Sequence, residues 1–394
     1  MGHGERDETG SEVTVTQRGA RRVRGAHPWI YTGDVAKAQA GTHDVVRVVD
    51  PRGRMLGTAF YNSRSQVALR MIGRAPVEVD ADFWRSRIRA AMDYRTELDI
   101  DADVYRLVHS EADRLPGLVV DRYADVLAVQ MLSGVVDQQR DDVIAALVDL
   151  AAPVAVVLRN DSRNRRLEGL PQKVEVVHGE LPAPLLVRDG KVRMEVDLLG
   201  GQKTGLFLDQ RENRAAARRY ARGRLLDCFS YHGAFALQLA GECDETIALD
   251  ISKEAVSAIR RNAELNGVRI DARAENVFDQ LRLFQDKGES FDTIVLDPPA
   301  FAKNRKAVTS ALKGYKDINL RALKLLKPGG HLITASCSYH IDSDAFLKVV
   351  TDAAADVRAE VALVERRVQS RDHPMRLGMP ESAYLKCLVL RKLA

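Results

Sequence analysis

Residues 224–235, RLLDCFSYHGAF, decide the fold: a short apolar run ends near Asp227 and is followed by a turn with one glycine, Gly233. Similar apolar runs recur at 246–250, 291–297 and 331–336, and helical patterns follow Gly233 and occupy residues 253–265 and the region near 317–326. Strands that alternate with helices in this way predict a doubly wound, mostly parallel α/β sheet. Because such sheets bind ligands beyond the carboxyl ends of their strands, the residues that follow the strands are the first site candidates.

The turn after the first of these strands indicates the kind of ligand. It lacks the G-x-G-x-x-G pattern that a dinucleotide pyrophosphate requires. Gly233 still allows close approach of the backbone, Asp227 can hold a cationic group, and Asp250 ends the second strand, where a carboxylate can accept hydrogen bonds from a ribose. A ligand with a ribose, a positive or zwitterionic end and no pyrophosphate is predicted, which is S-adenosylmethionine. The alternative is that both aspartates only cap the following helices.

Two further strand ends indicate a reaction. The third strand ends in Asp297-Pro298-Pro299, and the fourth is followed by Cys337. Carbon 5 of a pyrimidine is a poor nucleophile until a thiolate adds at carbon 6, so we predict that Cys337 is this thiolate and that Asp297 handles a proton near N3 of the base. The alternative for Cys337 is a small buried hydrophobic residue, which fits Cys228, Cys243 and Cys387 better.

The composition limits the class of protein. The chain has 394 residues, 45% hydrophobic and 29% charged, which favours two or three domains of a globular protein. No apolar run approaches the roughly 18 residues of a membrane helix, and the polar start does not resemble a signal peptide, so we expect a cytoplasmic protein with no membrane partner. The four cysteines show no C-x-x-C spacing, so neither a metal site nor a disulfide framework is expected.

The chain divides into three predicted domains: residues 13–74, 75–190 and 191–394. The first contains three short strand patterns typical of a small β-barrel and has 11 basic against three acidic residues, an excess of eight in a chain whose net charge is +4. A basic barrel of this kind favours a nucleic-acid partner, although a solvated basic face would look the same. The second domain has a helical pattern, a strand hairpin, a helix and a further strand, and is expected to be an α+β domain.

With these residues in view, the chain resembles the ribosomal large subunit methyltransferase I family, 23S rRNA cytosine-5 methyltransferases with an N-terminal PUA domain. The resemblance covers nearly the whole chain, and its motifs are RGAHPWIY at 24–31, YRLVHSEADRLPG at 105–117, GQKTGLFLDQR at 201–211, CFSY at 228–231 with Gly233, DPP at 297–299 with Phe301, GYKDIN at 314–319, SCS at 336–338 and DHP at 372–374.

The resemblance implies a PUA-like barrel, an α+β middle domain and a class I methyltransferase domain with a Rossmann-like sheet. It implies S-adenosylmethionine as cofactor and 23S rRNA or a large-subunit precursor as partner, with Cys337 as nucleophile and Asp297 as the acid beside the base. A homodimer is one option for the oligomeric state. The expected cofactor residues are Gln210, Asp227, Phe229, Ser230, Tyr231, Gly233, Asp250, Ile251, Ser252, Asn276, Val277, Asp297 and Pro298. The expected RNA contacts are Arg22, Arg24, Arg159, Arg163, Lys303 and Lys316.

Some positions depart from the family pattern. The family tends to have aspartate where this chain has Asn276, which would then have to accept a hydrogen bond from the adenine amino group through its amide oxygen. His340 and the absence of a glycine after Ser338 are further departures, and they concern the choice of target. Two other functions stay open: methylation of another nucleobase without covalent catalysis, and a non-catalytic RNA-binding assembly factor.

Overall fold

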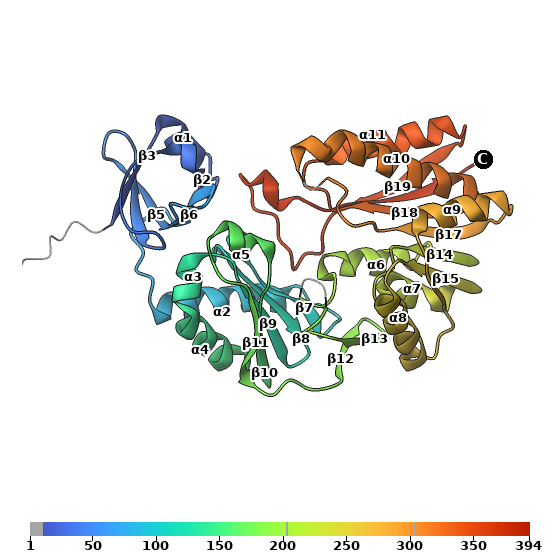
Figure 1. Cartoon of the computed structure of the whole chain (residues 1–394), viewed down its shortest axis with the longest axis horizontal. Helices are drawn as coiled ribbons and strands as arrows, with labels where there is room; N and C mark the ends of the chain where they lie inside the picture. Colours follow the sequence, from blue (N-terminus) through green and yellow to red (C-terminus); the bar gives the residue numbers. More distant parts are fainter. Residues whose placement is uncertain (1–10, 202–203, 303) are drawn as a thin grey trace, which may run out of the picture. The chain divides into compact units, whose positions relative to one another are not determined.

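The computed structural model describes residues 11–201, 204–302 and 304–394. The chain forms two compact units, each with its own sheets (Figure 1). The first unit contains residues 1–185, 197–205 and 372–382, and the second contains residues 186–196, 206–371 and 383–394.

The N-terminal part of the first unit is a six-stranded sheet in the order β2-β6-β5-β4-β1-β3 with one helix. All but one pair of neighbouring strands in this sheet run antiparallel, and β1 lies parallel to β4. Apolar side chains from the strands and the helix form its own core, which includes Val13, Ile30 and Leu69. The elements are β1 (Glu12–Val15), α1 (Gln17–Arg24), β2 (Trp29–Tyr31), β3 (Val35–Gln39), β4 (Val45–Val49), β5 (Met55–Tyr61) and β6 (Val67–Gly73).

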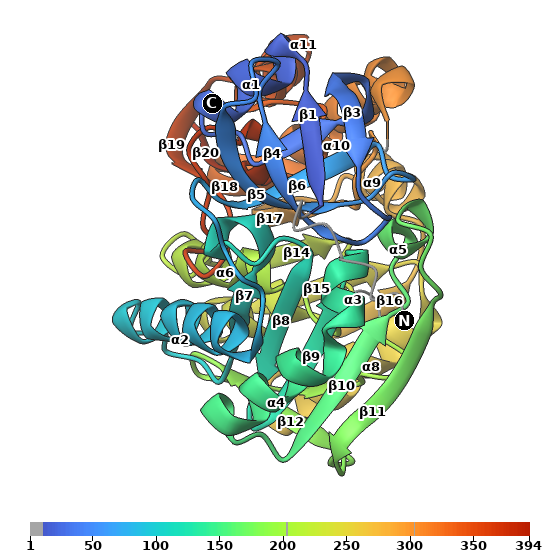
Figure 2. The ribbon, with the colours of Figure 1, turned by 90° about the vertical axis from the view of Figure 1, so that its left-hand side faces the viewer.

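The rest of the first unit is built on a five-stranded sheet in the order β11-β10-β9-β8-β7, over which α2, α3 and α4 lie (Figure 2). The predicted hairpin is present as the antiparallel pair β8 and β9, and β10 adds in parallel to β9. The elements are α2 (Ala81–Glu97), β7 (Val104–His109), β8 (Leu118–Tyr123), β9 (Val126–Met131), α3 (Gly134–Gln138), α4 (Arg140–Ala151), β10 (Ala155–Asn160), α5 (Arg163–Leu167) and β11 (Lys173–Gly179).

The second unit contains the predicted doubly wound sheet, with seven strands in the order β16-β15-β14-β17-β18-β20-β19. The first five strands of that order are parallel, and β20 is antiparallel to both β18 and β19. The elements are β12 (Leu185–Asp189) and β13 (Val192–Val196), which form a hairpin, then α6 (Arg211–Ala217), β14 (Arg224–Cys228), α7 (Ala234–Leu239), β15 (Glu245–Asp250), α8 (Lys253–Asn266), β16 (Asp271–Ala274), α9 (Val277–Asp286), β17 (Phe291–Leu296), α10 (Val308–Leu325), β18 (Leu326–Ser336), α11 (Ser343–Asp356), β19 (Val361–Arg367) and β20 (Lys386–Lys392).

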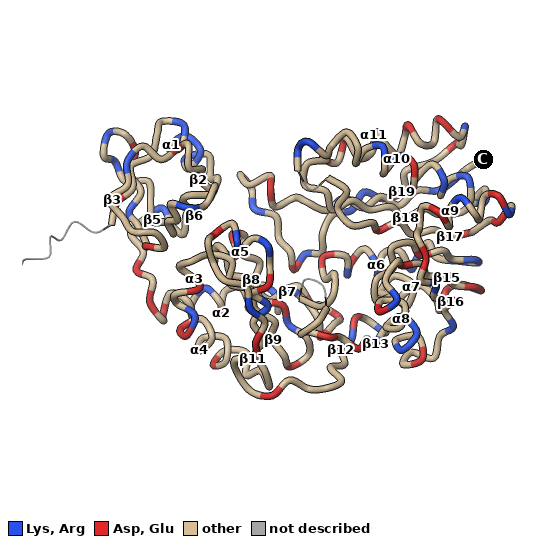
Figure 3. The backbone as a smooth tube through the Cα atoms, viewed as in Figure 1, with Lys and Arg blue, Asp and Glu red and all other residues tan. Residues whose placement is uncertain are grey.

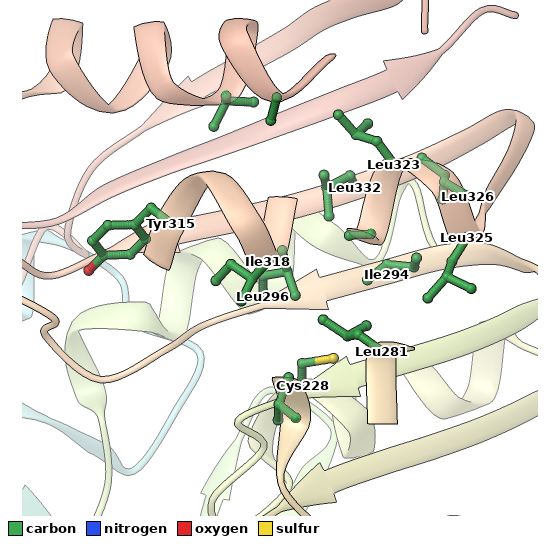
Figure 4. Close-up of a cluster of buried hydrophobic side chains, with 14 of the residues drawn as sticks. Cys228, Leu281, Ile294, Leu296, Tyr315, Ile318, Leu323, Leu325, Leu326 and Leu332 are labelled. Carbon is green, nitrogen blue, oxygen red and sulfur yellow. The ribbon is translucent and has the colours of Figure 1, made fainter. Parts of the chain in front are cut away.

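Helices cover both faces of this sheet because successive strand residues point to opposite sides. Leu226 and Ile294 face the large cluster formed with α9, α10 and α11, shown in Figure 4. Their neighbours Leu225 and Val295 face the opposite cluster, which includes residues of α7. The strands are therefore apolar on both sides, as expected for a buried parallel sheet, and the polar residues are left to the strand ends.

Two boundaries were predicted for the domains. The one after residue 74 falls between β6 and α2, and the one after residue 190 falls inside the β12–β13 hairpin. Among the helices that the structure describes, none is long and apolar enough to cross a membrane.

The large cluster should carry much of the second unit's stability. Leu281 of α9 is fully buried in it, whereas Leu283 on the same helix is 39% exposed. Leu281→Ala should lower the free energy of unfolding by about 2–5 kcal/mol, because it removes buried apolar surface and leaves a cavity. Leu283→Ala should change it by less than about 0.5 kcal/mol. Urea unfolding followed by circular dichroism measures both, and equal losses would show that the helix is not packed in this way.

Candidate active site

The parallel register brings three aspartates to one edge of the sheet. Cys228 at the end of β14 lies opposite Leu249 of β15 on one side and Leu296 of β17 on the other. Asp250 follows Leu249 and Asp297 follows Leu296, so the two aspartates flank the end of β14 on both sides. The backbone nitrogen of Asp297 also donates to the carbonyl oxygen of Cys228 at 3.4 Å. The predicted convergence of acidic strand ends is present.

Asp227 holds the turn after β14 in shape. Its side chain is buried, and its Oδ2 accepts hydrogen bonds from Ser230 Oγ at 2.5 Å and from the backbone nitrogen of Ala236 at 3.0 Å. Burial raises the pKa of Asp227 to about 7; the hydrogen bonds from Ser230 and Ala236 oppose this rise, and the nearby charges of Asp297 and Asp250 add to it. Asp227 therefore has the structural role that was the alternative for it, because both bonds hold the loop and the start of α7.

The turn itself is an unusual backbone segment. Phe229, Tyr231 and Gly233 all have positive φ angles, of 61°, 51° and 82°. Side chains rarely adopt this region, so the turn is held by its surroundings. At Gly233 a Cβ would also lie 3.1 Å from the side chain of Ile259. The glycine that the sequence singled out is thus required both by its φ angle and by the packing of α8.

Asp250 has the geometry of a hydroxyl acceptor. Its two oxygens accept backbone hydrogen bonds from Tyr231 and Ser252, each at 2.9 Å. A carboxylate has about four acceptor positions, so two further positions can serve a ligand. The next residue, Ile251, is an apolar side chain that is 73% exposed. An exposed apolar side chain beside a fixed carboxylate suits a nucleoside, which presents hydroxyls and a flat ring together.

Asn276 is placed differently from the expectation for it. It is the N-cap of α9, and its Oδ1 accepts from the backbone nitrogens of Phe278 at 2.9 Å and Asp279 at 3.4 Å. The amide oxygen that was expected to accept from an adenine amino group is therefore already engaged by the helix. The remaining nitrogen of the amide is a donor only. In the structure the side chain of Asn276 therefore serves to cap α9. Val277, which follows it, is buried in the large cluster.

Asp297 is positioned by a chain of amides. Gln210 Nε2 donates to Asp297 Oδ1 at 2.8 Å, and Gln210 Oε1 accepts from Asn213 Nδ2 at 2.6 Å. Arg367 in turn donates to the oxygen of Asn213 at 3.0 Å. Gln210 was expected in the cofactor set; the structure places its side chain against Asp297, and its contact with the cofactor stays a prediction. This chain of bonds fixes which way the carboxylate of Asp297 points.

Cys337 lies against the segment that carries Asp297. It follows the last residue of β18, and its thiol donates to the carbonyl oxygen of Pro298 at 3.9 Å, a weak contact that shows the two strand ends adjoin. The thiol of Cys337 is half-buried, whereas Cys228 and Cys387 are buried. Burial raises the pKa of Cys228 well above its usual value and that of Cys387 to about 12. The pKa of Cys243 is also raised to about 12, by burial and then by its acidic neighbours. Cys337 is thus the thiol beside the predicted acid.

Lys386 is a residue that the sequence analysis missed. It lies on β20 opposite Ser336, and its ammonium donates to the carbonyl oxygens of Ser338 at 2.7 Å and Tyr384 at 2.9 Å. The bond to Ser338 brings the ammonium to the residue next to Cys337, and Lys386 is only 3% exposed. Burial lowers the pKa of Lys386 to about 8, against the opposing effects of Cys337 and Asp342. A lysine inside the apolar run 384–390 was the signal available in the sequence.

An aromatic wall adjoins these strand ends. The rings of Phe229, Phe278 and Phe301 lie with centroids 6.1–6.4 Å apart, and Tyr315 lies 4.6 Å from Phe301. The hydroxyl of Tyr315 is 2.9 Å from Ser338 Oγ. Tyr315 is fully buried, whereas the three phenylalanine rings are only partly buried and so leave apolar surface that could hold a flat base or ring.

Basic residues are frequent along α1 (Figure 3). The residues expected to contact RNA differ in whether their side chains already have partners within the protein. Arg24 pairs with Asp50 at 2.6 Å, Arg22 lies over the Tyr31 ring, and Lys316 pairs with Asp356 at 2.8 Å. Arg163 is exposed at the start of α5, and Lys303 lies outside the described residues.

Arg159 has a structural role. Its side chain is 2% exposed, and its guanidinium donates to the carbonyl oxygens of Leu198 and Gly201, each at 2.7 Å, and to the carboxylate of Asp161. All of these partners belong to the protein, so the guanidinium holds the loop that includes Leu198 and Gly201. We therefore do not propose Arg159 as an RNA contact.

Comparisons with known proteins agree with this geometry. A model of the PUA-like domain matches residues 13–74, and a model of S-adenosylmethionine-dependent methyltransferases matches residues 161–391. Ribosomal RNA large subunit methyltransferase I of Erwinia tasmaniensis is 41% identical over 93% of this chain and 95% of its own length. The protein of the same name from Shewanella denitrificans is 41% identical over 94% and 96%.

Solved structures show the same fold. SMU.776, solved with SAH bound, superposes with a TM-score of 0.85 over 96% of this chain and 99% of its own, at 19% identity. A Streptococcus mutans protein described as a methyltransferase reaches 0.83 with the same coverage, at 20% identity. Identity to relatives over nearly the full length, together with the matching family models, shows that the chain belongs to the ribosomal RNA large subunit methyltransferase I family of S-adenosylmethionine-dependent methyltransferases.

Proposed function

We propose that this protein methylates carbon 5 of a cytosine in large-subunit ribosomal RNA, with Cys337 as the nucleophile. The observation that carries the proposal is the contact of the Cys337 thiol with Pro298, the residue after Asp297. The names of the relatives support ribosomal RNA as the substrate. Such a substrate places the protein in the cytoplasm, where ribosomes are assembled.

The edge of the sheet fits S-adenosylmethionine. Asp250 would bind the ribose hydroxyls through its two remaining acceptor positions, Ile251 would cover the adenine, and the backbone of the left-handed turn at Tyr231 and Gly233 would approach the amino-acid end. Asp227 would add negative charge near that end when it is ionised. When bound, the cofactor supplies a methyl group on a positively charged sulfur.

The protein's own groups would activate the base. The Cys337 thiolate forms a bond to carbon 6 of the cytosine, and the electron pair of the C5–C6 double bond moves toward N3, where Asp297 supplies a proton. Carbon 5 is then nucleophilic and can accept a methyl group. The proton on carbon 5 is then lost to solvent water, and the Cys337 thiolate leaves carbon 6 as the double bond re-forms. N3 returns its proton to Asp297, which regenerates the free enzyme. The bonds from Gln210 hold Asp297 in place for this role.

Lys386 would keep the thiol ionised. The thiolate is the reactive form of cysteine, and a nearby cation lowers a thiol's pKa. The buried ammonium of Lys386 donates to the carbonyl oxygen of Ser338, the residue after Cys337, and would meet this need. Burial raises the pKa of Tyr315, and Cys337 adds to this rise, so the hydroxyl of Tyr315 is a neutral neighbour of the thiol. Cys337 and Asp342 both act to raise the pKa of Lys386, so the lysine is the favourable charge beside the thiol.

Nucleoside analysis tests the reaction. The protein is incubated with S-adenosylmethionine labelled in its methyl group and with deproteinised 23S rRNA that lacks native modifications, and the RNA is then digested to nucleosides. Label in 5-methylcytidine is the expected result. Label in another nucleoside would replace the proposal with direct transfer to that base. With no label on naked rRNA, the assay is repeated on assembling large-subunit particles, and no label there would overturn the proposal in favour of an assembly factor.

Removing the thiol should abolish turnover and leave the cofactor site intact. Cys337→Ala should lower the methylation rate by on the order of 10³-fold or more, because addition to carbon 6 has no substitute nucleophile. Its affinity for S-adenosylmethionine, measured by calorimetry, should be unchanged. Cys243→Ala, at the partly buried thiol elsewhere in the unit, is the control and should keep full activity. A Cys337→Ala protein with most of its turnover would rule out covalent catalysis.

The effect of Lys386 can be measured without RNA. In Lys386→Met the alkylation of Cys337 by iodoacetamide at pH 7 should slow by about 10-fold, as expected when a neighbouring cation is lost. Because burial holds the pKa of Lys386 near 8, its charge is present below that pH and lost above it, so the difference should shrink as the pH rises. Peptide-resolved mass spectrometry reads the rate. Lys386→Arg should restore it, and equal rates in all three proteins would exclude the role.

The cap at Asn276 gives a prediction for cofactor affinity. Asn276→Asp places a carboxylate where it can cap α9 and still accept from an adenine amino group, so the Kd for S-adenosylmethionine should fall about 5-fold, the equivalent of roughly 1 kcal/mol. Asn276→Ser, which keeps the cap, should not tighten binding. Calorimetry measures both. An unchanged or weaker affinity in Asn276→Asp would show that the adenine does not reach this residue.

A further inference from the structure

A second site candidate lies in the first unit. A cavity of about 150 Å³ is formed by three parts of that unit: the turn after α1 with Pro28, the end of β6 from Met71 to Arg74, and the residues Arg114 and Arg376. Arg376 belongs to the segment 372–382. That segment is tied to the barrel, because Glu381 accepts a hydrogen bond from His27 at 3.1 Å, and to the middle domain, because the Asp372 carbonyl accepts one from Arg95 at 2.8 Å.

Three arginines supply the charge in a cavity wall that is otherwise mostly apolar. Arg74, Arg114 and Arg376 line it. Within the described part of the chain, the exposed guanidinium groups of Arg74 and Arg114 form no ion pair with a carboxylate. A fourth, Arg87, lies beside them and donates to the carbonyl oxygens of Arg114 and Ile72. The guanidinium groups of Arg74 and Arg114 can therefore still donate hydrogen bonds to an anion.

The acidic groups nearby are already used. Glu111 accepts from Arg70 at 2.9 Å and from the Trp29 indole at 2.7 Å. Glu381 is bonded to His27 and to the hydroxyl of Tyr31. The positive charge of the cavity wall is thus left largely uncompensated.

The arginines repel one another as a result. Burial, together with the charges of Arg114 and Arg376, lowers the pKa of Arg87 to about 10. The pKa of Arg376 is also lowered, by burial and by Arg114 and Arg74, with Glu111 acting in the opposite direction. Like charges held this closely cost free energy, which a bound anion would offset.

We propose that this cavity binds a phosphate group, with Arg74 and Arg114 as its principal ligands and Arg376 beside them. Guanidinium groups match the oxygens of phosphate in pairs, which favours this anion over a simple charge contact. His27 is tied to Trp29 and Glu381, so the wall offers charge and donors rather than a stacking surface. It therefore suits a backbone phosphate and not a base. That the phosphate belongs to RNA rests on the proposed function; a free phosphate ion has the same chemistry.

Filter binding of the full-length protein to deproteinised 23S rRNA lacking native modifications tests the RNA source. Arg74→Gln combined with Arg114→Gln should raise the Kd about 10-fold, and the slope of log K against log salt concentration should fall by about 1, because the one phosphate group held by the two arginines is lost. The matched control is Arg52→Gln with Arg89→Gln, which removes the same charge from exposed arginines outside the cavity. The control should change both quantities much less.

A second measurement identifies the free ion. The Tm of the wild-type protein is compared in sodium phosphate and in sodium chloride at matched ionic strength. A rise in phosphate that the cavity variant lacks, with RNA affinity unchanged, would support the site and assign it to the free ion. If the cavity variant matches the control in both RNA affinity and phosphate response, the proposal is overturned.

Neither readout requires methyl transfer, so the two proposals can fail separately. A protein that binds RNA through the cavity but forms no 5-methylcytidine would contradict the proposed function alone. Calorimetry with S-adenosylmethionine shows that the variants keep the fold of the second unit.

Discussion

The parallel pairing of β14 with both β15 and β17 is the constraint on which the site depends. It sets Asp250 and Asp297 one residue beyond the partners of Cys228, so that two carboxylates flank the end of the central strand. The next pairing, of β17 with β18, brings Cys337 to the same edge beside Pro298. A shift of one residue in any of these pairs would turn each side chain to the other face of the sheet. Packing on both faces of the sheet prevents such a shift.

Polar groups that are costly to bury hold this edge in shape. Asp227 is buried and uses its bonds to fix the left-handed turn, Gln210 orients Asp297, and Lys386 is buried between carbonyls next to the thiol. Each is satisfied by partners within the second unit, so the arrangement exists before any ligand binds. Preorganisation of this kind lowers the cost of reaching a reactive geometry.

Much of this architecture could be predicted from the sequence, because apolar runs on a parallel sheet are buried on both faces and end in polar residues. The strands β14, β15, β17 and β18 with the helices α7, α8 and α10, the hairpin β8–β9 and three strands of the barrel follow from such patterns. The prediction did not include the other elements of the second unit, which are β12, β13, β16, β19, β20, α6, α9 and α11. The start of α10 at Val308 was missed, since the predicted helix began near Asp317. The short elements α1, β1, β2 and β3 were missed as well, because three to eight residues carry too little periodicity.

The site was predictable where chemistry follows a strand, as at Asp250, Asp297 and Cys337. It was not predictable where the antiparallel strand β20 contributes, since nothing near Cys337 in sequence points to Lys386. The burial of Arg159 depends on tertiary contacts with Leu198 and Gly201. The cap at Asn276 is a local contact with Phe278 and Asp279 that the sequence analysis missed.

Trapping the covalent adduct tests the central claim most directly. In RNA that contains 5-fluorocytidine at the target, the fluorine cannot leave carbon 5 as a proton does, so the bond between thiol and carbon 6 should persist after methyl transfer. We expect a complex that survives denaturing electrophoresis, forms only with S-adenosylmethionine and RNA together, and carries the nucleotide on the peptide containing Cys337. Methyl transfer to this RNA without a stable complex, or an adduct on another residue, would contradict it.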